Sequence, residues 1–130
     1  MILKFHYGKG FLELDVPEAN LASVLESRFG KAAEDAEGEI ARALNNPIGS
    51  GRVEDLVKGE DRVALIVSDI TRPAPNQLMV PPIIEALRKA GLKGENLEII
   101  VANGLHRAPS RREMEELLGK RVLEEVTVLN

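Results

Sequence analysis

The chain has 130 residues, of which 44% are hydrophobic and 29% are charged, with a net charge of −4. This is the size and composition of one globular domain, and it excludes a wholly disordered chain. No run approaches the ~18 apolar residues of a membrane span, the N-terminus does not resemble a signal peptide, and the absence of cysteine excludes disulfides and thiolate metal sites. We therefore expect a cytoplasmic protein with no membrane contact. The negative charge and an aromatic content of 3% disfavour nucleic-acid binding.

Residues 2–16 predict a β-hairpin. Apolar and polar side chains alternate on both sides of Gly8-Lys9-Gly10, whose glycines supply the positive φ angles of a tight turn. His6 shares its strand face with Lys4, so we expect it to be a solvated surface histidine and not a catalytic one.

Residues 19–60 predict a helical region with interruptions. Apolar side chains at helical spacing indicate a first helix that stops at Gly30, and a second helix from about Ala33 to Leu44. Acidic residues crowd the start of the second helix. We interpret them as a solvated helix start and not as a metal cluster, because carboxylates favour the positive end of the helix dipole.

Residues 62–129 predict a β-α-β-α-β unit, in which two helices alternate with strands at 62–67, 97–102 and 126–129. Strands with apolar side chains on both faces are typical of parallel sheets that helices cover on both sides. Right-handed crossovers place both intervening helices on one face, so the helices of residues 19–60 are the candidate cover for the other face.

Two details of the expected helices follow from their sequences. Pro81 and Pro82 fit only near the first turn of the first helix of this unit, because a helical proline lacks an N–H donor. Ser110 and Glu113 have the spacing of a capping box, which predicts the start of the second helix.

The expected fold class is α/β: an N-terminal hairpin and helices, followed by a parallel, Rossmann-like sheet, within a single domain of residues 1–130. A doubly wound sheet normally continues with a helix after a strand, whereas this chain stops directly after one. We therefore interpret it as a fragment of a larger N-terminal domain. An uncovered sheet edge then predicts self-association of the fragment.

Two loops follow the carboxyl ends of the expected parallel strands, where open parallel sheets bind ligands. The first contains Asp69, Thr71 and Arg72, followed by Pro73 and Pro75, which restrict its backbone. A guanidinium group suits a carboxylate or a phosphate. The alternative is that Asp69 pairs with Arg72 and merely caps the turn.

The second loop contains His106, the histidine placed at the carboxyl end of a strand. An imidazole can accept or donate a proton near neutral pH, and Gly104 allows the backbone to approach a ligand closely. The alternative is a histidine that satisfies the start of the following helix. Two such loops side by side favour a functional site over either alternative.

The motifs of these loops resemble the amino-terminal part of the nickel-dependent lactate racemase family. The resemblance covers nearly the whole chain and is sharpest from Ser68 to Glu113. It rests on Asp69-Ile70-Thr71-Arg72-Pro73, Pro75-Asn76, Pro81-Pro82 and Ala102-Asn103-Gly104-Leu105-His106-Arg107.

This resemblance implies an isomerase that interconverts the configurations of 2-hydroxy acids. Members of the family use a nickel pincer cofactor derived from nicotinic acid, which accepts and returns a hydride. By resemblance, His106 matches a catalytic histidine that takes the proton of the substrate hydroxyl, and Arg72 matches the residue that binds the substrate carboxylate. Asp69 and Thr71 match loop residues near the cofactor. The family has two catalytic histidines, and no residue of this chain matches the second one, the tethering lysine or the nickel-ligating histidine; His6 matches none of these roles.

A non-catalytic alternative remains open at this point. The chain could be an α/β module that binds a small carboxylate or serves assembly. The expected partner is in either case a small molecule, a 2-hydroxy acid for the enzyme.

Overall fold

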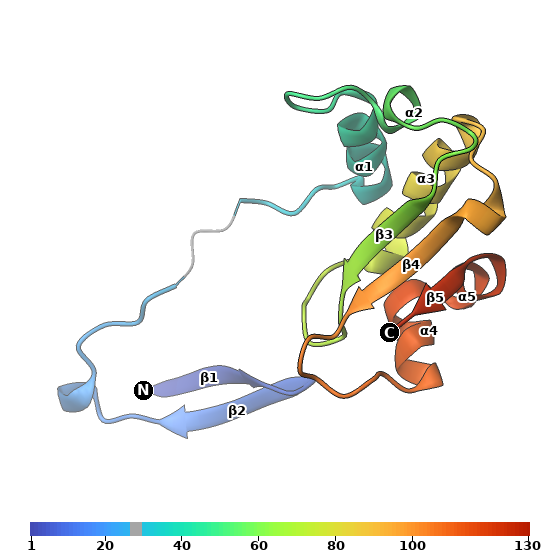
Figure 1. Cartoon of the computed structure of the whole chain (residues 1–130). Helices are drawn as coiled ribbons and strands as arrows, with labels where there is room; N and C mark the ends of the chain where they lie inside the picture. The colour runs from blue at the N-terminus through green and yellow to red at the C-terminus, as the bar shows by residue number, and fades with distance from the viewer. Residues whose placement is uncertain (27–29) are drawn as a thin grey trace. The chain divides into compact units, whose positions relative to one another are not determined.

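The computed structural model describes residues 1–26 and 30–130 (Figure 1). It contains an antiparallel β-hairpin, several helices and a three-stranded parallel sheet, which confirms the expected α/β class. The chain forms two compact units, Met1–Ala32 and Ala33–Asn130. Across the described ranges, no helix is both long and apolar enough to cross a membrane.

The first unit contains the expected hairpin. Strands β1 (Ile2–Tyr7) and β2 (Gly10–Asp15) pair in antiparallel register, and Gly8 has a φ of 58° in the turn. His6 is exposed on β1, as expected, with its ring centroid 4.5 Å from that of Phe11.

The helix expected from residue 19 to Gly30 is wrong for the part of this segment that the structure describes. After β2 the chain forms a short 3₁₀ helix, η1 (Glu18–Asn20), and residues 21–26 have no regular structure, while residues 27–29 lie outside the described ranges. The side chain of Leu25 is 93% exposed. Apolar residues at helical spacing are not enough to form a helix here, because a short helix is stable only when its apolar face packs against another part of the protein.

The next helix, α1 (Ala36–Asn45), begins about three residues later than the expected Ala33 start. Asp35 sets this start, because its side chain accepts a hydrogen bond of 2.8 Å from the Gly38 N–H. The acidic residues at this end are exposed, as the interpretation of a solvated helix start requires. A second, one-turn helix, α2 (Val53–Leu56), was not expected.

Three parallel strands form the sheet of the second unit. Strands β3 (Val63–Ser68), β4 (Leu97–Ala102) and β5 (Thr127–Leu129) lie in the order β3-β4-β5. The register between β3 and β4 runs from Val63 opposite Leu97 to Ser68 opposite Ala102, so these two strands end level with each other.

Helix α3 (Asn76–Lys89) connects β3 to β4, and it corrects one expectation. Pro81 and Pro82 lie in its middle and not in its first turn. The helix tolerates the two missing N–H donors because it buries Val80, Ile84 and Leu87 against the sheet. A short 3₁₀ helix, η2 (Gly94–Asn96), then precedes β4.

Between β4 and β5 the chain forms two helices where one was expected. Helix α4 (Arg111–Leu118) begins with the expected capping box of Ser110 and Glu113. Gly119, with a φ of 82°, ends α4, and α5 (Lys120–Glu125) follows directly. Gly119 is thus the junction of two helices.

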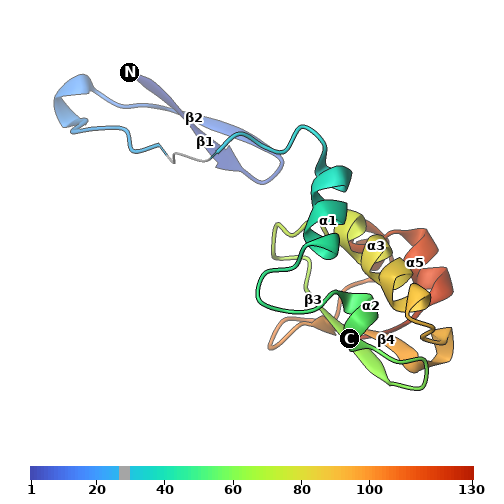
Figure 2. The same cartoon turned by 90° about the horizontal axis from the view of Figure 1, so that it is seen from above.

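The hydrophobic core lies on one face of this sheet. Alternate residues of β3 and β4 point into it, Ile99 is fully buried, and α1, α3 and α5 lie on one side of the strands (Figure 2). Helices α1 and α2 pack on α3 and not on the opposite sheet face. For α1 and α2, the α-helices that the structure describes in this region, the expectation that they cover the second face is therefore wrong. Ile66 on this open face is 67% exposed.

Candidate active site

The two loops singled out in the sequence leave the sheet side by side. Ser68 and Ala102 are partners in the β3–β4 register, so the residue after each strand starts a loop at the same edge. Residues 69–75 lead to α3, and residues 103–110 lead to α4. The parallel register thus positions the candidate site, as the order of elements predicts.

The first loop is a succession of tight turns. The Arg72 N–H donates to the Asp69 carbonyl at 3.2 Å, and the N–H groups of Ala74 and Asn76 donate to the carbonyls two residues before them, at 2.8 and 2.9 Å. Pro75, with φ −79° and ψ 58°, has the geometry of an inverse γ-turn. Pro75 is therefore the central residue of the last of these turns.

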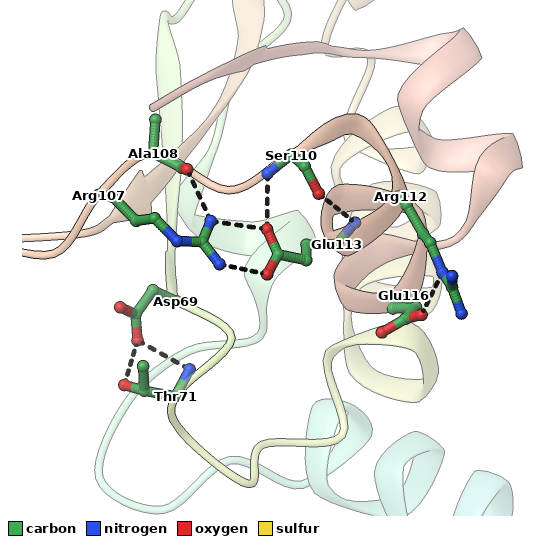
Figure 3. Close-up of polar contacts among 8 residues, drawn as sticks. All are labelled: Asp69, Thr71, Arg107, Ala108, Ser110, Arg112, Glu113 and Glu116. Carbon is green, nitrogen blue, oxygen red and sulfur yellow. Dashed lines mark hydrogen bonds and ion pairs between the residues drawn. The ribbon is translucent and has the colours of Figure 1, made fainter.

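Asp69 is the buried acid of this loop, with 5% of its surface exposed. Its Oδ1 accepts hydrogen bonds from the Thr71 hydroxyl at 2.7 Å and the Thr71 N–H at 3.2 Å (Figure 3), and its Oδ2 contacts Nδ1 of His106. The Thr71 hydroxyl and then the His106 ring hold the pKa of the Asp69 carboxyl below its ordinary value, against the opposing effect of burial. The alternative in which Asp69 pairs with Arg72 is not what the described residues show.

The second loop turns back toward the first. Gly104 has a φ of 58°, and the His106 N–H donates to the Asn103 carbonyl at 3.0 Å, which closes a turn. The His106 side chain is 53% exposed and contacts Asp69. The start of α4 is capped by Ser110 and Glu113, so the alternative role of His106 as a helix cap is not observed.

An arginine–glutamate pair anchors the second loop to α4, and sequence reasoning missed it. Arg107 Nη1 and Nη2 donate to the two carboxylate oxygens of Glu113 at 2.8 and 2.6 Å (Figure 3). The same carboxylate accepts from the Ser110 N–H at 2.7 Å. Arg107 and then Ser110 lower the pKa of Glu113 to about 2. The capping box was the signal in the sequence that could have predicted this pair. Its glutamate needs only one oxygen to accept from the Ser110 N–H, so the other oxygen can accept from a basic residue upstream.

The structure does not place Arg72 in the same cavity as His106. His106 lines a pocket of about 70 Å³ together with Asp69 and Thr71. Arg72 lines a neighbouring pocket of about 360 Å³ at the start of α3. Ile70 contributes to both walls. Of the four residues that sequence and resemblance assign to the site, three therefore meet directly and the arginine lies next to them.

Each of these two pockets is lined by an asparagine that has one buried polar side-chain atom. Asn76 Nδ2, beside Arg72, and Asn103 Oδ1, beside His106, are buried without a hydrogen-bond partner among the described residues. Both belong to the motif segments, but their residue type alone did not distinguish them. In the described part of the chain, no group of three or more His, Cys, Asp or Glu side chains could hold a metal ion.

Comparison with known proteins identifies the family of this chain. Residues 7–130 match the model of the lactate racemase N-terminal domain. The chain belongs to this family. A lactate racemase N-terminal domain is also what the motifs of the two loops indicated, and the match extends beyond those loops to the turn and second strand of the hairpin and to both α/β crossovers.

Two curated relatives are lactate racemases. The chain is 35% identical to that of Thermoanaerobacterium thermosaccharolyticum over 124 residues, covering 94% of this chain and 29% of the relative. It is 29% identical to that of Lactiplantibacillus plantarum over 121 residues, covering 90% of this chain and 28% of the relative. A solved structure, the lactate racemase apoprotein from T. thermosaccharolyticum, aligns with a TM-score of 0.80 and 32% identity, covering 99% of this chain and 30% of that one. The chain thus spans less than a third of these relatives.

Proposed function

We propose that the full-length protein is a racemase or epimerase of lactate-type 2-hydroxy acids, and that this chain supplies one wall of its active site. The observation that carries the proposal is the contact of His106 with Asp69 at the paired ends of β3 and β4. A half-exposed imidazole, held by a buried carboxylate, is a suitable base for a hydroxyl group. Membership of a lactate racemase family supports the same substrate class.

Each residue has a defined task in this proposal. His106 takes the proton of the substrate hydroxyl and returns it after the configuration has changed. Arg72 binds the substrate carboxylate through its planar guanidinium. When the hydroxyl proton is taken and the C=O bond forms, the hydrogen on the same carbon leaves as a hydride, with its electron pair, and these side chains offer no acceptor for it.

The proposal therefore includes the nickel pincer cofactor that the family resemblance implies. When bound, this group would supply the hydride acceptor. The resemblance implies that the nickel ligand and the tethering lysine lie outside this chain, and the part of the chain that the structure describes holds no group of three or more His, Cys, Asp or Glu side chains that could bind a metal ion. Thr71 fits a contact with the cofactor because it is exposed beside His106. Asp69 does not fit such a contact, because its side chain is 6% exposed and both its oxygens are engaged.

The runner-up is a non-catalytic module that binds a small carboxylate. One observation favours it: Arg72 lines its own pocket, whose volume of about 360 Å³ lies within the usual range for small-molecule sites. The pocket at His106 is far smaller than that range. In the enzyme, further residues would have to complete a site that spans both.

The two functions are separated by one assay. Full-length protein, isolated with its cofactor, is incubated with a single lactate enantiomer, and both enantiomers are followed by chiral chromatography. The enzyme proposal predicts conversion toward an equal mixture, because the two enantiomers have the same free energy. Saturable binding of lactate without interconversion would contradict it and support the module.

A further inference from the structure

The two oxygens of the Asp69 carboxylate have separate partners. Oδ1 accepts both hydrogen bonds from Thr71 and so closes the turn that follows β3. Oδ2 contacts Nδ1 of His106, 37 residues further along the chain. The resemblance implies only a place near the cofactor for Asp69, whereas its contacts connect it to the base.

The protonation of Asp69 determines the direction of its hydrogen bond with His106. Its Thr71 and His106 partners favour the ionised carboxylate, and an ionised carboxylate can only accept hydrogen bonds. Nδ1 must therefore carry the hydrogen. A neutral imidazole with hydrogen on Nδ1 has its lone pair on Nε2.

From this geometry we propose that Asp69 is a positioning residue that fixes His106 in the tautomer with a free lone pair on Nε2. The role of that nitrogen as the base rests on the proposed function, whereas the tautomer itself does not. Because Asp69 is buried and His106 is half-exposed, the carboxylate acts on the ring from the protein side and leaves the other side to the substrate. Buried acids orient the base histidine of hydrolases in the same way.

Asp69→Asn separates the two tasks of the side chain. Asparagine keeps an oxygen that can accept from Thr71, so the turn is preserved. Its amide group, however, replaces Oδ2 with a donor toward Nδ1 of His106. The ring must then place its hydrogen on Nε2, where the lone pair of the base is lost.

Thr71→Val is the matched control. It removes the hydroxyl donor to Oδ1 but leaves Oδ2 and its contact with His106. A structural role of the loop alone would make both substitutions act alike. The proposal predicts that only Asp69→Asn changes the tautomer.

The first readout is the nitrogen NMR spectrum of the histidine rings at about pH 9, well above the usual histidine pKa range. The chain has two histidines, and exposed His6 serves as the internal reference. We expect hydrogen on Nδ1 of His106 in the wild type and in Thr71→Val, and on Nε2 in Asp69→Asn, with His6 unchanged. Hydrogen on Nε2 of His106 in the wild type, or no change in Asp69→Asn, would overturn the proposal.

The second readout is the kinetics of the full-length enzyme, which stays informative if a variant of the short chain does not fold. We expect Asp69→Asn to lower kcat by ~10²-fold or more with little change in KM, and His6→Ala, on the exposed hairpin strand, to leave kcat unchanged. Normal kcat in Asp69→Asn, alongside an inactive His106→Ala, would overturn the positioning role alone. Normal kcat in His106→Ala would instead refute the proposed function, and the tautomer result would stand by itself.

Discussion

At the residue scale, the sequence predicted that three side chains of the candidate site lie close together, but it did not predict their individual contacts. Asp69, Thr71 and His106 were chosen because they follow parallel strands, and the structure brings them together. Their contacts could not be predicted, because they depend on the turn at Gly104 and on the strand register, not on sequence spacing. The place of Arg72 in a separate pocket was unpredictable for the same reason.

Arg72→Ala should act mainly on substrate binding. A hydrogen bond to a charged group is worth about 1.5–3 kcal/mol, so we expect KM for the 2-hydroxy acid to rise about 10- to 100-fold with a smaller change in kcat. Arg72→Lys should restore binding only in part, because an ammonium group lacks the planar fork. Steady-state kinetics of the full-length enzyme provide the check. A loss confined to kcat would show that Arg72 does not hold the carboxylate.

Glu113 should make the stability of the chain depend on acid pH. Its pKa is lowered from 4.5 to about 2 in the folded chain, so its stabilising contribution is complete above about pH 4.5 and disappears as the pH falls toward 2. We expect the difference in unfolding free energy between wild type and Glu113→Gln to shrink across this range. Urea titrations at several pH values measure it. A difference that stays constant from pH 6 to 2 would contradict the Arg107–Glu113 contact.

At the element scale, the buried strands and the capped helices were the most predictable parts. β3, β4, β5 and α4 have strong local signals, either continuous apolar runs or a capping box. The errors fall where tertiary packing outweighs local pattern. The apolar residues at helical spacing before Gly30 form no helix in the described residues, where Leu25 is largely exposed. Helix α3, in contrast, extends through Pro81 and Pro82 because its apolar face is buried.

Ser110→Ala should weaken the start of α4. The substitution removes the side-chain acceptor of the Glu113 N–H, and losses of this kind cost about 1 kcal/mol of unfolding free energy. The matched control is Ser50→Ala, because Ser50 lies in an exposed loop and caps no helix. Its cost should stay within about 0.5 kcal/mol. Chemical denaturation measures both variants, and equal costs would contradict the capping role.

At the scale of the whole molecule, the second unit has one covered and one open sheet face. Alternate strand residues pack under the helices, whereas Ile66 and Leu129 on the other face are 67% and 45% exposed. The sequence alone could not show that one face is open. Apolar side chains on both faces of the strands predict that both faces are covered, but they do not identify which segments cover them. The chain spans 29% of a curated lactate racemase, so its activity is a property proposed for the longer protein.

The open face predicts that the 130-residue chain self-associates. Exposed apolar side chains next to edge strands favour pairing between copies. We expect the mass from light scattering to rise with concentration, and Ile66→Lys to suppress the rise. Leu105→Lys is the control, because Leu105 is fully exposed but belongs to the loop after β4 and not to the open sheet face. A wild-type monomer at all concentrations would refute the prediction.

The central claim is that His106 is the base of a lactate-type racemase, and one comparison of rates tests it most directly. The turnover of one lactate enantiomer is measured for full-length His106→Ala and His6→Ala, with cofactor occupancy checked by absorbance. Removal of a general base typically costs ~10²–10⁴-fold in rate, and this loss is expected for His106→Ala. His6→Ala should retain the wild-type kcat, because His6 lies exposed on the hairpin. A cofactor-loaded His106→Ala enzyme with near-normal kcat would contradict the account.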